Sequence, residues 1–384
     1  MEGRLRRLTH DAYEGGGTSG GAAAFVRRLR TPPSSAAKDV EIGLRALVPA
    51  RTVPAMTITP LAVPPPATAV DAWHAVVTAA HRHDLPAAVP APGRVETEGK
   101  LSRSSVHGRT VRLAATAPDG AYDGVASLLL FTDEGNRHTA FLDVLAVHPR
   151  ARRRGVGAAL WQAVRAELTA DGRTSVSTML ELGGAGEQFA TRLGFENVLP
   201  LGWYVQNVRD ALAAHPRPPE LPEGYAYAQW PGVVPDTHAD AFAAAHNAME
   251  DAPSGDMDEQ VPTWDADSVR AAAQVILDRG GVILSSAVLH AASGDSVAAY
   301  TELVLRDPSD ERAVQYDTVV TPDHRGRGLG RAVKRHMLGA VSLAQPGVRE
   351  IATSVADDNG PMLAVNEQLG YRRERTAAVF QAKL

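Results

Sequence analysis

The stretch YDTVVTPDHRGRGLGRAVKRHML, residues 316–338, decides the fold prediction. It begins with an apolar, β-branched run that is typical of a buried strand. Pro322 ends this run, and a basic, glycine-rich loop follows at residues 325–330. Apolar residues then recur at helical spacing. The first N–H groups of a helix have no internal partner, and glycine lets an anion approach them closely. The stretch therefore predicts a turn that binds a pyrophosphate.

A second copy of this pattern lies at residues 142–164, LDVLAVHPRARRRGVGAALWQAV. A Leu-Gly-aromatic element follows each copy, at residues 193–195 and 369–371. The two copies in register indicate an internal duplication. The matched loop positions are 173 residues apart (325 − 152 = 173) and comprise Arg152 with Arg325, Gly155 with Gly328, and Gly157 with Gly330.

Length and composition describe an ordinary globular chain. Its 384 residues fit two domains of about 150 residues each. The formal net charge of −5 does not favour nucleic acid or an anionic membrane as a partner. There is no cysteine, which excludes disulfides, thiolate catalysis and cysteine-zinc sites. The longest apolar runs are too short to cross a bilayer, and a cytoplasmic protein is expected.

The order of predicted elements gives the domain organisation. Residues 1–54 are rich in glycine, proline and arginine, and we expect a disordered or mis-started tail there. A first domain is expected at 55–208, a Pro-rich linker at 209–222 and a second domain at 223–384. Each half shows several strands in hairpin order with interspersed helical segments. The predicted class is α+β, with a mainly antiparallel, twisted sheet and flanking helices in each half.

Other phosphate-binding motifs do not fit the two loops. A Rossmann fingerprint needs a third glycine where Arg331 and Leu160 stand, and a Walker A loop needs Gly-Lys-Ser/Thr. The pattern Arg-x-x-Gly-x-Gly between a strand and a long helix, followed by a short helix with a Leu-Gly-aromatic ending, resembles the GNAT superfamily of acetyl-CoA-dependent N-acetyltransferases. The resemblance extends over residues 56–208 and 223–384. The chain resembles a tandem form of this superfamily, of actinobacterial type, and it is distantly similar to mycothiol synthase.

The resemblance implies that acetyl-CoA is the cosubstrate. No cluster of His, Asp and Glu in the sequence has metal-ligand spacing, so no metal is expected. In the family, the loop amides hold the pyrophosphate and the preceding strand contacts the pantetheine arm. By motif position, the implied cofactor-binding residues are Val319, Val320, Arg325, Gly326, Arg327, Gly328, Leu329, Gly330 and Asn359 in the second half, and Val147, Arg152, Gly155 and Gly157 in the first.

Catalytic residues are predicted in the second half. Asp317 and Glu302 lie on neighbouring predicted strands, and either carboxylate is a candidate general base, with a structural ion pair as the alternative. Many members of the family carry a proton-donating tyrosine where this chain has Asn366, an amide that cannot be a general acid. The first half has Ala190 at that position and resembles the non-catalytic first domain of mycothiol-synthase-like enzymes.

The sequence thus predicts an N-acetyltransferase that acts on a primary amine of a small molecule, by direct attack in a ternary complex. No cysteine is present to carry an acyl group, which agrees with direct transfer. The alternative is a non-catalytic acyl-CoA-binding or scaffolding protein, which Asn366 keeps open.

Overall fold

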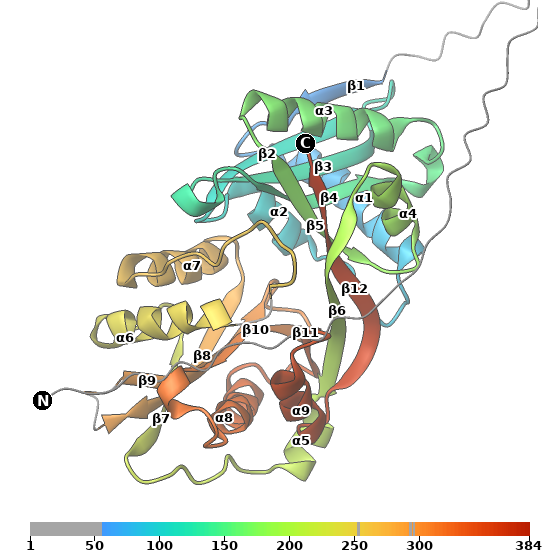
Figure 1. Ribbon diagram of the computed structural model, residues 1–384. Helices are drawn as coiled ribbons and strands as arrows, with labels where there is room; N and C mark the ends of the chain where they lie inside the picture. Colours follow the sequence, from blue (N-terminus) through green and yellow to red (C-terminus); the bar gives the residue numbers. More distant parts are fainter. Residues whose placement is uncertain (1–55, 252–253, 292–293, 295) are drawn as a thin grey trace, which may run out of the picture. The chain divides into compact units, whose positions relative to one another are not determined.

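A single 12-stranded sheet organises the protein (Figure 1). The computed structural model describes residues 56–384 except 252, 253, 292, 293 and 295, so the predicted tail at 1–54 lies outside the described residues. Along the sheet the strands run β1-β2-β3-β4-β5-β12-β6-β11-β10-β9-β8-β7. Nearly all neighbours are antiparallel, while β4 with β5 and β10 with β11 are parallel. The predicted α+β class with a mainly antiparallel sheet is confirmed.

Elements up to residue 214 make up the first half of the chain. In order they are β1 (Thr57–Pro60), α1 (Ala67–Asp84), α2 (Arg94–Ser102), β2 (Gly108–Thr116), β3 (Tyr122–Phe131), β4 (Ala140–Val147), α3 (Val156–Ala170), β5 (Ser175–Glu181), α4 (Ala185–Arg192), β6 (Glu196–Asn207) and α5 (Val208–Ala214).

The second half repeats this order from residue 225. Its elements are β7 (Tyr225–Pro231), α6 (Asp236–Asn247), α7 (Ala266–Asp278), β8 (Val282–His290), β9 (Ser296–Leu305), β10 (Arg312–Val320), α8 (Leu329–Ala344), β11 (Glu350–Ala356), α9 (Gly360–Gln368) and β12 (Arg372–Lys383).

The two halves exchange their last strands. β6 pairs with the whole length of β11, from Leu201 opposite Ala356 to Asn207 opposite Glu350. β12 pairs with β5 in the first half, and β12 and β6 also pair with each other. The side chains of an exchanged strand also pack in the other half, as Phe380 of β12 is buried in the core of the first half.

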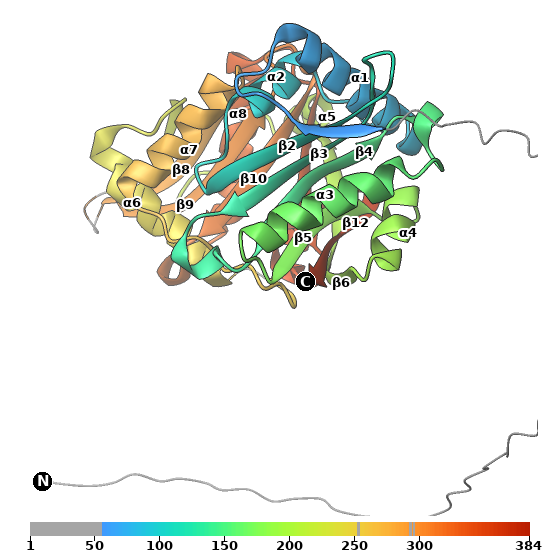
Figure 2. The same cartoon turned by 90° about the horizontal axis from the view of Figure 1, so that it is seen from above.

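Helices cover both faces of the sheet (Figure 2). In the first half, α3 packs on one face of the strands and α1 with α2 on the other. In the second half, α6 and α7 share cores with one face of β8 to β10, and α8 packs into the cores of the opposite face. Among the described residues, no helix has the length and apolar composition to cross a bilayer.

Parallel neighbours separate soon after they meet. β10 and β11 are in register only from Arg312 opposite Glu350 to Val314 opposite Ala352. β4 and β5 share one registered pair, Phe141 with Ser177. Each half therefore has a V-shaped opening between two parallel strands, and the glycine loop lies at the far end of one arm.

Most predicted elements are present. The sequence predicts strands at 122–131 and 296–305, and both have these bounds in the structure. It predicts the last strand of each half at 203–208 and 377–383, but these strands start earlier, at Glu196 and Arg372. The sequence did not predict α2. It also missed α5, which occupies the start of the segment predicted as a linker. The strand exchange was not predicted either.

Removing a side chain of β12 is expected to destabilise the first half. Phe380→Ala deletes a ring that is 4% exposed, so the free energy of unfolding should fall by about 3–5 kcal/mol. Leu343→Ala is the control, because Leu343 is 86% exposed and its loss should cost less than about 0.5 kcal/mol. Urea unfolding measures both variants, and equal losses would contradict the exchange of packing described here.

Candidate functional site

The second-half loop has the backbone of an anion cradle. Gly326 and Gly328 both have φ of +75°, a region that residues with a Cβ rarely adopt. A Cβ at either position would meet no atom within 4 Å, so the space above the loop is open. Gly328 is the N-cap of α8, whose first N–H groups have no carbonyl partner inside the helix. Arg325 donates from Nε to the Val320 carbonyl at 3.1 Å, which ties the loop to β10.

The first-half loop has the same geometry with different partners. Gly155 is the N-cap of α3 with φ of +87°, and Arg152 Nε donates to the Val147 carbonyl at 3.1 Å. Here the arginine also forms two hydrogen bonds with Asp84, at 2.7 and 2.6 Å. Both predicted loops are thus shaped to accept a phosphate group, while the Arg152 guanidinium is already neutralised.

Glu302 and Asp317 lie close together, and His246 of α6 lies between them. His246 Nε2 is 3.7 Å from the Glu302 carboxylate, and Nδ1 is 3.9 Å from that of Asp317. A β-bulge brings Asp317 there, because the register between β10 and β9 shifts between Gln315 and Thr318. The bulge lies beyond the point where β10 leaves β11, on the face of the sheet covered by α6 and α7.

Burial shifts the titration of all three groups. Desolvation, with the nearby Asp317 charge, raises the pKa of Glu302 to about 8. Desolvation raises the pKa of Asp317 by less, to about 6, and its side chain is still 41% exposed. The pKa of His246 is lowered to about 4 by burial, so this imidazole is neutral at pH 7. Two carboxyl groups that resist ionisation at one spot suit proton transfer.

A small cavity of about 230 Å³ opens beside these groups. Trp264 and side chains of α7 supply much of its wall, and Glu302, Asp317 and His246 supply its polar part. His107 of the first half also lines it and contacts Trp264 edge-to-face at 5.0 Å. Among the described lining residues there is no lysine or arginine, so the cavity favours an amine over an anion.

His246, Glu302 and Asp317 also have the composition of a metal site, which the sequence did not predict. One ligand atom from each lies within 4.8 Å of the others. His246 directs different ring nitrogens at the two carboxylates, so one ion cannot engage both of those contacts at once.

The other predicted second-half residues lie at α9 and on β10. Asn359 is the N-cap of α9 and accepts a hydrogen bond from the Met362 N–H at 3.2 Å. Asn366 is 1% exposed, and its Oδ1 accepts a hydrogen bond from Lys334 Nζ at 2.6 Å. Val319 packs into the core under α6, and Val320 packs against the core under α8. A catalytic role for Asn366 stays a prediction.

The loop between α6 and α7, which carries Asp256 and Asp258, contacts β12 and the first half. Asp258 pairs with Lys383 of β12, and its N–H donates to Gln381 Oε1 at 2.8 Å. The Asp256 N–H donates to the Val198 carbonyl at 3.0 Å. In this structure the described part of the loop therefore joins the halves.

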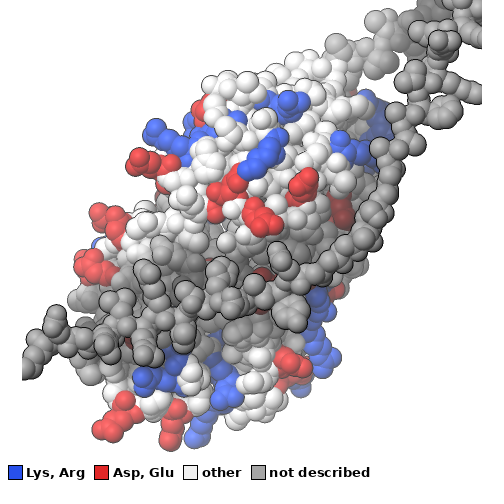
Figure 3. Space-filling view, viewed as in Figure 1, with Lys and Arg blue, Asp and Glu red and all other residues white. Residues whose placement is uncertain are grey.

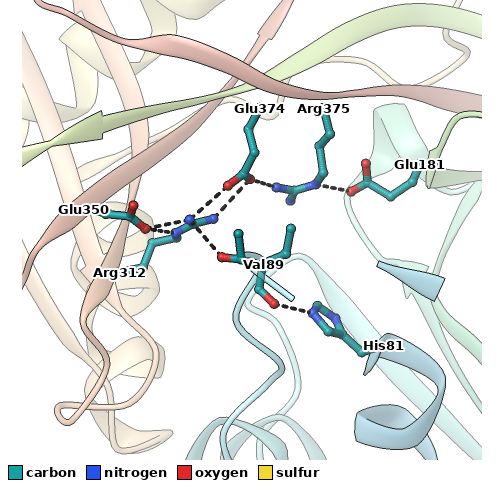
Figure 4. Close-up of polar contacts among 8 residues, drawn as sticks. His81, Val89, Glu181, Arg312, Glu350, Glu374 and Arg375 are labelled. Carbon is teal, nitrogen blue, oxygen red and sulfur yellow. Dashed lines mark hydrogen bonds and ion pairs between the residues drawn. The ribbon is translucent and has the colours of Figure 1, made fainter. Parts of the chain in front are cut away.

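A larger cavity, about 1300 Å³, lies at the first-half loop and reaches residues of the second half. An ion-pair network lines its inner part (Figure 4). Arg312 pairs with Glu350 at 2.6 Å and with Glu374 at 2.9 Å, Glu374 pairs with Arg375, and Arg375 pairs with Glu181 at 2.7 Å. These carboxylates are all matched with arginines, unlike Glu302 and Asp317.

Aligned strands show what the first half lacks. The halves are aligned through equivalent strand pairs, Val147 with Gly124 in the first half and Val320 with Ala299 in the second. In this alignment Ser127 corresponds to Glu302, and Val144 corresponds to Asp317. The carboxylate pair therefore has no equivalent in the first half. Sequence reasoning missed His246 and Lys334, since a single histidine or lysine in an amphipathic helix carries no distinctive signal.

Comparison with known proteins agrees with the fold and the loops. Residues 105–195 and 246–371 match the family model described as the acetyltransferase (GNAT) family. These segments span more than half of the chain, and the chain belongs to this family of acetyltransferases. On the face drawn in Figure 3, acidic and basic side chains of the described residues are interspersed.

The chain is also similar to two mycothiol acetyltransferases. That of Geodermatophilus obscurus is 29% identical over 271 residues, covering 67% of this chain and 78% of the relative. That of Actinosynnema mirum is 29% identical over 257 residues, covering 66% and 78%.

Solved structures share the tandem fold. A tandem GNAT protein from the clavulanic acid biosynthesis pathway superposes with a TM-score of 0.72 at 24% identity, over 86% of this chain and 98% of that chain. A GCN5-related N-acetyltransferase from Sphaerobacter thermophilus gives a TM-score of 0.60 at 16% identity, over 85% and 95%.

Substitution of Gly328 tests the second-half cradle. Gly328→Glu should raise the Kd for CoA in that half more than about tenfold, because the carboxylate would occupy and repel the phosphate position. Gly328→Ala also places a Cβ at this positive φ but adds no charge, so it should weaken binding far less. Calorimetric titration with CoA gives both values. Unchanged affinity in Gly328→Glu would contradict the assignment of the cradle.

Proposed function

We propose that the protein transfers the acetyl group of acetyl-CoA to a primary amine of a small molecule, and that the second half carries out the reaction. The observation that carries the proposal is the Glu302–His246–Asp317 cluster. Glu302 lies on β9 and Asp317 on β10, the strand that leads to the open glycine loop, and the first half lacks both carboxylates. Similarity to mycothiol acetyltransferases supports acetyl transfer as the chemistry.

The residues present fit acetyl-CoA. Gly326, Gly328 and the first amides of α8 would hold the pyrophosphate, and Arg325 and Arg327 add positive charge beside it. Strand β10 runs from this loop toward the bulge, and beyond Val314 its edge is no longer in register with β11, which leaves the V-shaped opening for the pantetheine arm. Bound there, acetyl-CoA supplies an activated acyl group to an amine in the cavity beside Glu302.

Glu302 is the proposed general base. Its side chain is 12% exposed and accepts a hydrogen bond from Ser285 Oγ at 3.2 Å, which fixes its position. In its ionised form, Glu302 takes the proton of the acceptor ammonium, and the free amine then attacks the thioester carbonyl. Asp317 is a second carboxyl group near the amine, and the His246 imidazole between the two is neutral. The N–C bond forms and the C–S bond breaks, and the nitrogen loses its second proton as the amide forms. That proton passes through solvent to the thiolate, while the proton held by Glu302 returns to solvent.

Division of labour between the halves is part of the proposal. The first half keeps the glycine loop, but its inner cavity is lined by paired charges and it has Ser127 and Val144 in place of the two carboxylates. We propose that this half supports the second half through the shared sheet and does not catalyse transfer.

The pH dependence of turnover tests the base. The kcat/KM for thiol release from acetyl-CoA with a panel of primary amines should rise between about pH 6 and 9, since the carboxyl pair must ionise. Glu302→Gln should lower kcat about 100-fold or more and flatten this profile. The control is Asp143→Asn in the first half, which should change kcat by less than about twofold. An unaltered profile in Glu302→Gln would overturn the assignment.

Stability gives a second readout that needs no acceptor. Because the pKa of Glu302 is about 8 in the folded protein, the folded state binds more protons than the unfolded chain between about pH 5 and 8. Stability from this group is present at low pH and is lost as the pH rises through 8. Glu302→Gln should therefore lose less unfolding free energy than the wild type between pH 5 and pH 9. Parallel pH curves in urea unfolding would contradict the raised pKa.

A further inference from the structure

The cavity beside Glu302 has a wall whose composition restricts the acceptor. Two carboxyl groups come from Glu302 and Asp317, and most of the remaining wall is apolar. The apolar side chains of α7 and β8 in this wall are Val269, Ala272, Ala273, Ile276 and Ile283. The described lining residues include no serine, threonine, asparagine or glutamine, and no lysine or arginine. The wall can therefore match one cationic group and an apolar body, but few further polar groups.

The two histidines of the wall do not add positive charge. Burial lowers the pKa of His107 and that of His246, so both imidazoles are mainly neutral at pH 7. The His246 ring is stacked on that of Tyr300, with 4.5 Å between the ring centres. A carboxylate or phosphate in the cavity would thus face Glu302 and Asp317 without a lysine or arginine among the described lining residues to offset the repulsion.

The exposure of the lining residues distinguishes the mouth of the cavity from its inner end. Tyr316 is 42% exposed and the Asp317 side chain is 41% exposed, so these residues of β10 mark the mouth. Val269, Ala273 and Ile283 are buried and mark the inner end. A bound acceptor would therefore have its amine at the carboxyl groups and its apolar body between α7 and β8.

Trp264 forms an aromatic wall of the cavity that both halves hold in place. The Asn247 side chain accepts a hydrogen bond from the Trp264 N–H at 2.7 Å and donates one to the Trp264 carbonyl at 3.0 Å. Asn136 of the first half binds the N–H and the carbonyl of Gln260 in the same way, at 2.8 and 2.9 Å. His107 of the first half contacts the Trp264 ring edge-to-face at 5.0 Å. The shape of the wall is therefore set before an acceptor binds.

The volume of the cavity limits the size of the acceptor. The cavity encloses about 230 Å³. An engineered apolar cavity of about 150 Å³ in another protein holds one benzene molecule. The space beside Glu302 thus suits a body the size of one ring, and the remainder suits a short chain that carries the nitrogen to the carboxyl groups.

We propose that the acceptor is a compact, apolar primary monoamine, with one ring or a branched alkyl group on a short chain and without a carboxylate, a phosphate or several hydroxyl groups. The inference rests on the proposed function and names the substrate class of its acceptor. The apolar body lies between Trp264, α7 and Ile283, and the amine lies beside Glu302 and Asp317. His107 of the first half determines specificity, because it closes the wall around the body.

A panel of three amines tests the substrate class. The probes are phenethylamine, phenylalanine, which adds a carboxylate, and glucosamine, which has hydroxyl groups in place of the apolar body. The kcat/KM for thiol release from acetyl-CoA should be about 100-fold or more higher with phenethylamine than with either of the others. A preference below about tenfold, or a preference for phenylalanine or glucosamine, would overturn the inference, while acetyl transfer to these amines would still support the proposed function.

Two variants change the size of the cavity in opposite directions. Ala272→Leu fills part of it and should lower kcat/KM for phenethylamine about tenfold or more, with less effect on ethylamine. Ala271→Leu is the matched control, because Ala271 is the exposed neighbour on α7, and it should change kcat/KM by less than about twofold. His107→Ala removes part of the wall and should raise kcat/KM for naphthylethylamine about threefold or more relative to phenethylamine.

Calorimetric titration with acetyl-CoA shows whether each variant is folded, and its Kd should stay within about twofold of that of the parent protein. If Ala272→Leu does not fold, the His107→Ala variant decides. Unchanged preferences among the amines in folded variants would overturn the assignment of the cavity to the acceptor. If the parent protein binds acetyl-CoA but acetylates no primary amine, the proposed function fails and the inference fails with it.

Discussion

The pairing of β12 with β5 and β6 is the interaction on which the rest of the structure depends. Backbone N–H and C=O groups at a sheet edge need partners, and here the last strand of each half supplies them to the other half. The cores follow the strands, since Phe380 packs in the first half and Val208 packs in the second. Neither half has a closed sheet or a complete core by itself. Both V-shaped openings therefore have one wall that depends on the partner half.

Within this shared frame, the two halves have kept one backbone and diverged in chemistry. Both retain a glycine N-cap with positive φ and an arginine bonded to the end of the preceding strand. They differ inside, where the second half buries carboxylates and the hydrogen-bonded side chains of Lys334 and Asn366 at positions that are small or apolar in the first. Burying such groups costs free energy that apolar residues would not cost. Their restriction to one copy is the main physical reason to place the reaction there.

Local patterns predicted much of this structure from the sequence. Apolar runs in hairpin order predicted β3 and β9, and glycine spacing predicted both loops. Glu302 and Asp317 were separate candidates on neighbouring predicted strands, and their approach to the same histidine is visible only in the structure. Partners between distant strands leave no local pattern, so β12 beside β5 was not predicted. His246 and Lys334 were missed because their importance depends on burial against particular neighbours. Asn366 was noticed only through the resemblance to a family, and its contact with Lys334 is visible only in three dimensions.

The strand exchange also has a consequence for the order of events during synthesis. β12 leaves the ribosome after every other described element, yet Ala378, Phe380 and Ala382 belong to the first-half core. Until they emerge, the nascent first half carries an unpaired β5 edge and an unfilled core, although its own residues were translated long before. Completion of both halves therefore waits for β12, the last described strand. Chaperone protection during that interval would matter more for this chain than for two independently folding domains.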